Sequence, residues 1–203
     1  MERVTEAYSK DDVMSMMEPL LAEWFSGRFS ELTEPQSFAI PLIHRRENVL
    51  VSSPTGSGKT LTAFLSIINE LLRYAKDGKL EDRVYAVYVS PLKALANDIN
   101  RNLREPLSEV TALADRKGVP FPEIRVGVRS GDTSQAERQK MLRKPPHIFI
   151  TTPESLAMVL AAPKFKEKFS KVEWAIVDEV HEICDSKRGV FLSLTLERLQ
   201  ALC

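Results

Sequence analysis

The sequence has few cysteines: only Cys184 and Cys203 occur among its 203 residues. They form no CxxC pair, and no histidine stands at the spacing of a zinc site. Isolated thiols of this kind stay reduced inside cells, whereas small secreted domains pair them in disulfides. We therefore interpret both residues as ordinary reduced thiols and expect a cytoplasmic protein.

The sequence also lacks a long apolar run and a net charge. No run approaches the roughly 20 residues that cross a bilayer, and the polar start MERVTEAYSKDD is not typical of a signal peptide. We therefore expect no membrane contact. Because 28 basic side chains balance 28 acidic ones, a generally cationic nucleic-acid binder is not indicated. Any site for nucleic acid has to be a local patch.

Short β-rich runs and helical patterns alternate along the chain, with no internal repeat and no flexible linker. The runs are 48–53, 84–90, 124–130, 147–152 and 172–178, and the helical stretches between them are 60–75, 92–118, 134–144 and 153–162. Apolar strands separated by crossover helices are typical of a parallel sheet. We predict an α/β fold, a doubly wound, mostly parallel sheet with helices on both faces. Such sheets bind ligands at the carboxyl ends of their strands.

The stretch SPTGSGKT, residues 53–60, has the composition of a phosphate-binding loop. Glycines at 56 and 58 let backbone N–H groups turn inward toward an anion, and a helix start adds free donors. Lys59 would reach the β- and γ-phosphates, and the Thr60 hydroxyl would bind Mg²⁺. Ser53 replaces the usual first glycine, which a small residue can do. The predicted nucleotide contacts are Pro54, Thr55, Gly56, Ser57, Gly58, Lys59 and Thr60.

The stretch WAIVDEVHEI, residues 174–183, places acids directly after a buried run. Unpaired carboxylates near a core are costly, so either the segment is a solvated acidic turn or a positive charge lies against it. Magnesium on nucleotide phosphates supplies such a charge. Asp178 would hold the metal, usually through water, and Glu179 would act as general base on the attacking water. We interpret Glu182 and Asp185 as surface acids.

These two motifs together resemble motifs I and II of superfamily 2 helicases of the DExH group. FSELTEPQ resembles a Q motif, with Phe29, Thr33 and Gln36 at its spacing. The resemblance implies that Gln36 recognises adenine and that Phe29 stacks on the base. Residues 91–99 resemble motif Ia, residues 129–132 resemble the short strand-end motif that follows it, and residues 151–156 resemble motif Ib. The sequences of these segments are similar to those of the large-helicase-related (Lhr) family.

The resemblance implies the first of two RecA-like domains of an ATP-dependent DNA or RNA helicase, with ATP and Mg²⁺ as cofactors. His181 would couple the state of the nucleotide to nucleic-acid binding. A single strand of DNA or RNA would be held through its phosphates at Lys93, Arg129, Thr152 and Glu154. For Lys93 and Arg129, a plain solvated charge remains the alternative. Lys187 and Arg188 are left unassigned.

Other aromatic and imidazole side chains are expected to have structural roles. His44 lies in a helical pattern and His147 at the start of a β-rich run, so we interpret both as structural or solvated. Trp24 and Phe25 precede the Q motif and are expected in the core rather than on a nucleic-acid base.

The resemblance also defines what to expect of the chain as a whole. We predict an N-terminal helical extension over 1–23 and a RecA-like domain over 24–203. No motif III, no motifs IV to VI and no matched arginine finger follow, so the chain resembles a fragment whose second RecA-like domain lies elsewhere. Because such an arginine contributes roughly 10³–10⁵ in rate, the isolated chain should be a weak enzyme.

Two other functions remain open from the sequence. The chain could be a P-loop enzyme of another class, such as a small-molecule kinase or a GTPase, although no guanine-reading NKxD motif is present. It could also be a non-catalytic module that binds nucleotide and nucleic acid. Measuring ATP turnover with and without single-stranded nucleic acid distinguishes these possibilities.

Nucleotide binding should depend on Lys59 and on Mg²⁺, because the N–H groups of the loop leave much of the phosphate charge uncompensated. We expect Lys59→Ala to weaken ATP binding strongly. Calorimetric titration of ATP into both proteins measures this, and equal affinities would contradict the assignment of residues 53–60.

Overall fold

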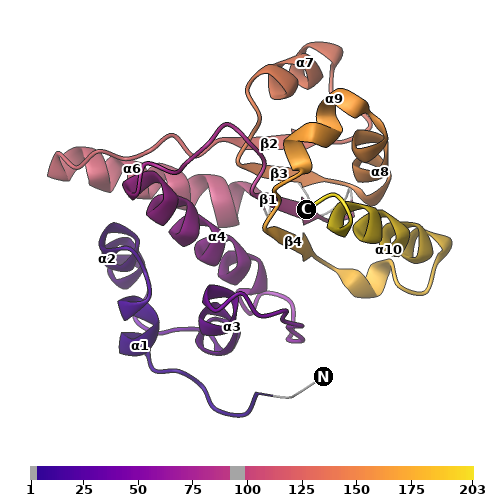
Figure 1. The fold of residues 1–203 in the computed structure, drawn as a ribbon. Helices are drawn as coiled ribbons and strands as arrows, with labels where there is room; N and C mark the ends of the chain where they lie inside the picture. The colour runs from indigo at the N-terminus through magenta and orange to yellow at the C-terminus, as the bar shows by residue number, and fades with distance from the viewer. Residues whose placement is uncertain (1–3, 92–98) are drawn as a thin grey trace. The chain divides into compact units, whose positions relative to one another are not determined.

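The computed structural model describes residues 4–91 and 99–203. The chain forms two compact units (Figure 1). The helical unit consists of Met1–Leu80 and Asp98–Pro122, and the sheet unit consists of Glu81–Asn97 and Glu123–Cys203. None of the described helices is long and apolar enough to cross a membrane.

The helical unit is built on the long helix α4, whose inward face is apolar and buried. Ser9 begins α1 with a capping box, and Gly118 ends α6 in the left-handed conformation that glycine adopts without steric cost. Its elements are α1 (Lys10–Ser15), α2 (Pro19–Arg28), α3 (Glu34–His44), α4 (Lys59–Lys76), the π-helix η1 (Asn100–Arg104) and α6 (Glu105–Lys117).

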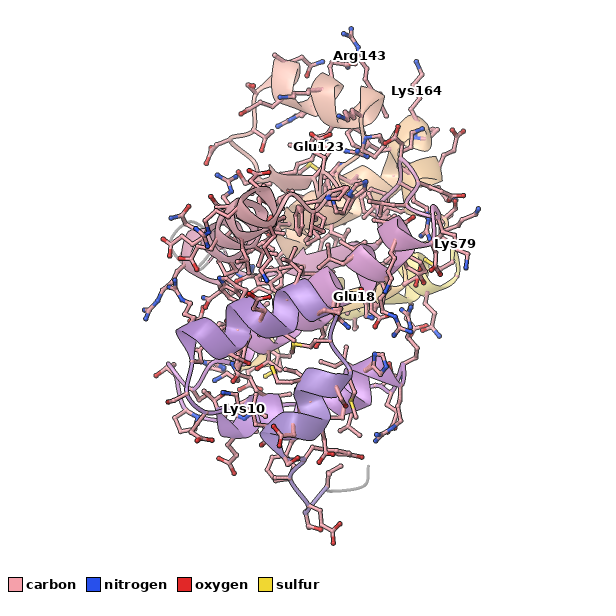
Figure 2. All side chains as sticks on the ribbon, turned by 90° about the vertical axis from the view of Figure 1, so that its left-hand side faces the viewer. Lys10, Glu18, Lys79, Glu123, Arg143 and Lys164 are labelled. Atoms are coloured by element: carbon pink, nitrogen blue, oxygen red, sulfur yellow. The ribbon has the colours of Figure 1, made fainter. Side chains whose placement is uncertain are left out.

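Within this unit, specific polar contacts hold the N-terminal helices in place. Asn69 of α4 is buried; its Oδ1 accepts from the Glu18 N–H at 2.6 Å and its Nδ2 donates to the Met16 carbonyl at 3.1 Å. Lys10, labelled in Figure 2, donates to the carbonyls of Phe29 and Ser30 at 3.0 and 2.7 Å. Helix α2 runs across the predicted boundary between residues 23 and 24.

The sheet unit contains four parallel strands in the order β2-β3-β1-β4. The strands are β1 (Ala86–Val89), β2 (Val126–Arg129), β3 (Ile148–Thr151) and β4 (Trp174–Val177). Its helical elements are α7 (Gln135–Arg143), α8 (Pro153–Ala161), α9 (Pro163–Lys166), η2 (Glu167–Phe169), η3 (Val180–Glu182) and α10 (Lys187–Gln200). The α/β class and the parallel sheet are therefore confirmed.

One face of the sheet packs against helices of its own unit. Val87, Val89 and Phe149 point to this face and form a core with apolar residues of α8, α9 and α10 (Figure 1). Tyr88 and Ile150, which point the other way, are also buried. Burial on both faces explains why the strands are continuously apolar instead of alternating.

The prediction of a strand at 48–53 is wrong, because these residues form no strand in the structure. A strand needs a hydrogen-bonded neighbour, and apolar residues favour one only where they are covered. Leu50 in this run is 62% exposed, so its apolar side chain is not packed as in a central strand. The other predicted strands are confirmed, each shorter than its apolar run.

The two structural histidines differ in environment. His44 Nδ1 lies 2.9 Å from Oε1 of the buried Glu70. His147, at the entry to β3, is only 1% exposed, and its Nδ1 accepts from the Arg125 N–H at 3.3 Å. Burial, helped by the nearby Arg125 cation, lowers the pKa of His147 from 6.5 to about 4. The neutral imidazole is thus part of the fold.

This depressed pKa makes stability depend on pH. Between pH 6.5 and 4 the unfolded chain binds a proton that the folded chain does not, so the stability present above pH 6.5 is lost as the pH falls. We expect the free energy of unfolding to drop by about 2 kcal/mol between pH 7 and 5 from this group alone. Urea unfolding of the parent and of His147→Gln checks this. An identical pH dependence in the two proteins would show that His147 is not responsible.

Candidate functional site

The loop 53–60, predicted to bind phosphate, enters α4 through two left-handed glycines. Gly56 has φ +79° and Gly58, the N-cap of α4, has φ +93°, values that residues with a side chain rarely adopt. The first N–H groups of α4 have no carbonyl of a preceding turn to bind and form the positive end of the helix dipole. The hydroxyls of Ser53 and Ser57 lie 2.7 Å apart across the loop. Serine thus fits in the position where glycine is usual.

Lys59 lies over its own loop. Its Nζ donates to the carbonyl oxygen of Ser53 and, at 2.9 Å, to that of Pro54. The ammonium group is therefore held at the loop by two backbone carbonyls, and phosphate oxygens can exchange with these carbonyls as its acceptors. Thr60, the next residue, is half-buried in the first turn of α4.

The Q-motif residues lie against this loop within the helical unit. Thr33 is the N-cap of α3, and Gln36 completes its capping box by accepting from the Thr33 N–H at 2.8 Å through Oε1. A Cβ placed on Gly58 would lie 3.0 Å from Thr33 Oγ1 and 3.5 Å from Gln36 Nε2. Gln36 is only 2% exposed. The structure therefore joins the two predicted nucleotide motifs by direct packing.

Phe29 lies in an aromatic cluster at the end of α2. Its ring centroid is 4.9 Å from that of Phe25 and 6.1 Å from that of Trp24, the latter edge-on. Trp24 and Phe25 are buried, which confirms their predicted place in the core. Phe29 itself is half-buried, so part of its ring remains accessible. Stacking of this ring on adenine stays a prediction.

The acids follow β4 in the sheet unit. Asp178 extends the strand pairing by one residue, since its N–H donates to the Val89 carbonyl at 2.9 Å. Its Oδ1 accepts from the Glu179 N–H at 2.9 Å, and its Oδ2 accepts from the Tyr88 hydroxyl. Glu179 has φ +49°, an unusual conformation for a residue with a side chain. Strained backbone of this kind is common at functional sites.

The neighbours of these acids are exposed. His181 Nδ1 lies 3.4 Å from Glu179 Oε2, and its side chain is 73% exposed. Glu182 and Asp185 are also exposed, as expected of surface acids. Within residues 4–91 and 99–203, no three His, Cys, Asp or Glu side chains gather as a metal site. The hydroxyl of Thr60 and the carboxylate of Asp178 are hard oxygen donors of the kind that Mg²⁺ accepts alongside phosphate and water.

The predicted nucleic-acid residues differ in exposure. Arg129 is only 8% exposed, with its guanidinium 4.6 Å from the Phe165 ring centroid, so a plain solvated charge is wrong for this residue. Burial and the charge of Arg138 lower the pKa of Arg129. Thr152 is buried and caps α8 by accepting from the Ser155 N–H at 3.3 Å. Lys93 lies outside the described residues.

Two contacts at this site were not predicted from the sequence. Glu154 pairs with Arg188, whose Nε lies 2.7 Å from Oε1, which gives the previously unassigned Arg188 a partner. The hydrogen bond from Tyr88 to Asp178 is the other. No local sequence motif indicates either contact, because each joins two segments that are distant in the sequence.

A side chain at Gly58 should disturb nucleotide binding through Thr33 and Gln36. Gly58→Ala places a methyl group against Thr33, whereas Gly78→Ala, also at a left-handed position (φ +68°), meets no atom within 4 Å. Both variants should lose about 1 kcal/mol of stability. Only Gly58→Ala should also weaken ATP binding, by about tenfold, which is about 1.4 kcal/mol. Thermal unfolding and calorimetry separate the two effects. Equal affinities in the two variants would contradict the packing role of Gly58.

Comparison with known proteins gives close relatives of much greater length. The ATP-dependent helicase Lhr-Core of Methanothermobacter thermautotrophicus is 60% identical over 195 residues, which are 96% of this chain and 22% of that protein. The Lhr helicase/probable uracil glycosylase of Mycolicibacterium smegmatis is 47% identical over 191 residues, 94% of this chain and 12% of that protein. The chain thus spans about a fifth or less of the length of these relatives.

Solved structures show the same fold. The helicase Lhr of Mycobacterium smegmatis bound to ssDNA and AMP-PNP matches with a TM-score of 0.84 and 45% identity, over 94% of this chain and 24% of that chain. The DUF1998 helicase MrfA bound to DNA and AMPPNP matches with a TM-score of 0.72 and 26% identity, over 92% of this chain and 25% of that chain. Residues 33–203 match the DEAD/DEAH box helicase family. The chain belongs to that family.

Proposed function

We propose that this chain is the ATP-binding, first RecA-like domain of an ATP-dependent helicase that moves on single-stranded DNA or RNA. The observation that carries the proposal is the packing of Gly58 against Thr33 and Gln36. It joins a loop suited to phosphate with an amide suited to adenine, at the start of one helix. A kinase or GTPase reading accounts for the loop but not for this amide.

The proposed nucleotide contacts of the helical unit come from the loop 53–60, from α3 and from Phe29. The N–H groups of residues 54–60 and the Lys59 ammonium bind the phosphates, as expected at a helix N-terminus. The Gln36 amide pairs with the adenine edge, and Phe29 offers a ring face to the base. As their motifs imply, the Thr60 hydroxyl and the Asp178 carboxylate would each offer an oxygen to Mg²⁺, which would offset charge on the phosphates.

The proposed catalytic residues of the sheet unit follow β4. Glu179 accepts a proton from the attacking water, because a carboxylate one water away from its target can act as general base. Its distance of 3.4 Å from His181 lets that histidine respond to the state of the base. His181 is then the route by which nucleotide state influences the strand-end residues Arg129, Thr152 and Glu154, together with Lys93, that contact nucleic-acid phosphates.

The remaining length of the relatives is proposed to supply a second RecA-like domain. Such a domain closes over ATP and adds an arginine to the transferring phosphoryl group. The 203-residue chain alone should therefore turn ATP over slowly and bind single strands weakly. The relatives named above are called helicases, and one is solved with ssDNA and AMP-PNP, which supports this assignment. We also propose a cytoplasmic location from the cysteine usage.

Glu179→Gln is expected to keep nucleotide binding while abolishing turnover, because it removes a base and not a phosphate contact. Steady-state ATPase with and without single-stranded DNA, in the longer protein that contains this chain, measures the turnover. Calorimetry measures binding, and Glu182→Gln, at an exposed surface acid, is the matched control. Unchanged ATPase in Glu179→Gln would exclude it as the base. Absence of ATPase in the parent under all conditions would exclude the proposed function.

A further inference from the structure

Tyr88 and Asp178 meet because of the register between β1 and β4. The strands run parallel with Tyr88 opposite Ile176, so Asp178 lies two residues further along the same face. Side chains at such diagonal positions are within reach of a long aromatic residue. Tyr88 is 2% exposed, and its hydroxyl donates to Asp178 Oδ2. The opposite oxygen, Oδ1, accepts from the Glu179 N–H at 2.9 Å.

Both carboxylate oxygens of Asp178 thus accept a hydrogen bond, one from Tyr88 and one from Glu179. An isolated aspartate can turn about its side-chain bonds, but two donors on different oxygens fix its plane. An ionised carboxylate has about four acceptor sites, so it can accept these two hydrogen bonds and still bind a metal ion or the water around it.

We propose that Tyr88 is a positioning residue that sets the orientation of Asp178 toward Mg²⁺. The proposal rests on the proposed function, in which Asp178 holds the metal that accompanies ATP. Partners that hydrogen-bond a metal-binding carboxylate fix its geometry and commonly change metal affinity when they are removed. A phenylalanine would fill this place in the strand without the hydroxyl. The phenol adds a hydroxyl whose acceptor is the proposed metal-binding acid itself.

If Tyr88 orients Asp178, its removal should weaken Mg²⁺ binding, whereas a purely electronic effect of the hydroxyl would make its removal strengthen Mg²⁺ binding. Removing the donor leaves more negative charge on Asp178, which by itself would tighten Mg²⁺ binding. It also frees the carboxylate to rotate, which weakens binding by leaving the oxygens poorly aimed. If orientation dominates, the variant without the hydroxyl needs more Mg²⁺ than the parent.

Tyr88→Phe tests this role, because it keeps the buried ring and removes only the hydroxyl. The affinity for AMP-PNP is measured by calorimetry across a series of Mg²⁺ concentrations and in EDTA. We expect the Mg²⁺-dependent gain in affinity to fall about tenfold, with the affinity in EDTA unchanged. Tyr85→Phe is the matched control: Tyr85 lies just before the same strand, is fully buried, and its hydroxyl accepts from the Glu81 N–H at 2.8 Å.

A double variant separates positioning from a general effect on the fold. In an Asp178→Ala background, Tyr88→Phe should cause no further loss, because the group it positions is gone. Three results would each overturn the positioning role. The first is an equal loss of Mg²⁺-dependent affinity in Tyr85→Phe and Tyr88→Phe, and the second is a further loss when Tyr88→Phe is added to Asp178→Ala. The third is a Mg²⁺-dependent gain in Tyr88→Phe that equals or exceeds that of the parent. In the last case the parent retains its Mg²⁺-dependent gain, so the nucleotide site itself stands. If the parent shows no such gain, the site and the role of Tyr88 fail together.

Discussion

The parallel hydrogen-bond ladder of the sheet is the constraint on which the arrangement of the sheet unit depends. Because β2, β3, β1 and β4 all run in one direction, their carboxyl ends lie at one edge. Arg129, Thr151 and Val177 end three of these strands, so the residues that follow them lie at the same edge of the sheet.

In the helical unit a steric constraint at Gly58 positions the residues of the proposed nucleotide site. The loop can enter α4 only through a left-handed residue at position 58, and the space beside that residue is already occupied by Thr33 and Gln36. Glycine satisfies both conditions. The capping box of α3 holds the Gln36 side chain in place through the Thr33 N–H. Local helix capping therefore also fixes the spacing between the proposed adenine-reading amide and the phosphate loop.

Much of this could be predicted because it is local. The loop 53–60, the acids after β4 and the apolar runs of β1 to β4 carry their own signals in composition and spacing. The run 48–53 carries the same signal but forms no strand, because strand formation depends on a neighbour that composition does not specify. The Tyr88–Asp178 contact could not be predicted, since it requires the register of β1 on β4. The burial of Arg129 against Phe165 could not be predicted either, because it depends on how α9 packs near the end of β2.

The strand order also separates the charges of the site. Arg129 ends β2 at one side of the sheet, and Asp178 follows β4 at the other. Three strand spacings of about 4.8 Å place these positions about 14 Å apart, far beyond the distance of an ion pair. The two groups therefore do not neutralise each other, although the whole chain has no net charge. In the described part of the chain, Nη1 of Arg129 has no hydrogen-bond partner, and Arg138 adds a second positive charge nearby. A neutral protein can in this way keep a cationic end suited to phosphate and an acidic end suited to a metal ion on a single sheet edge.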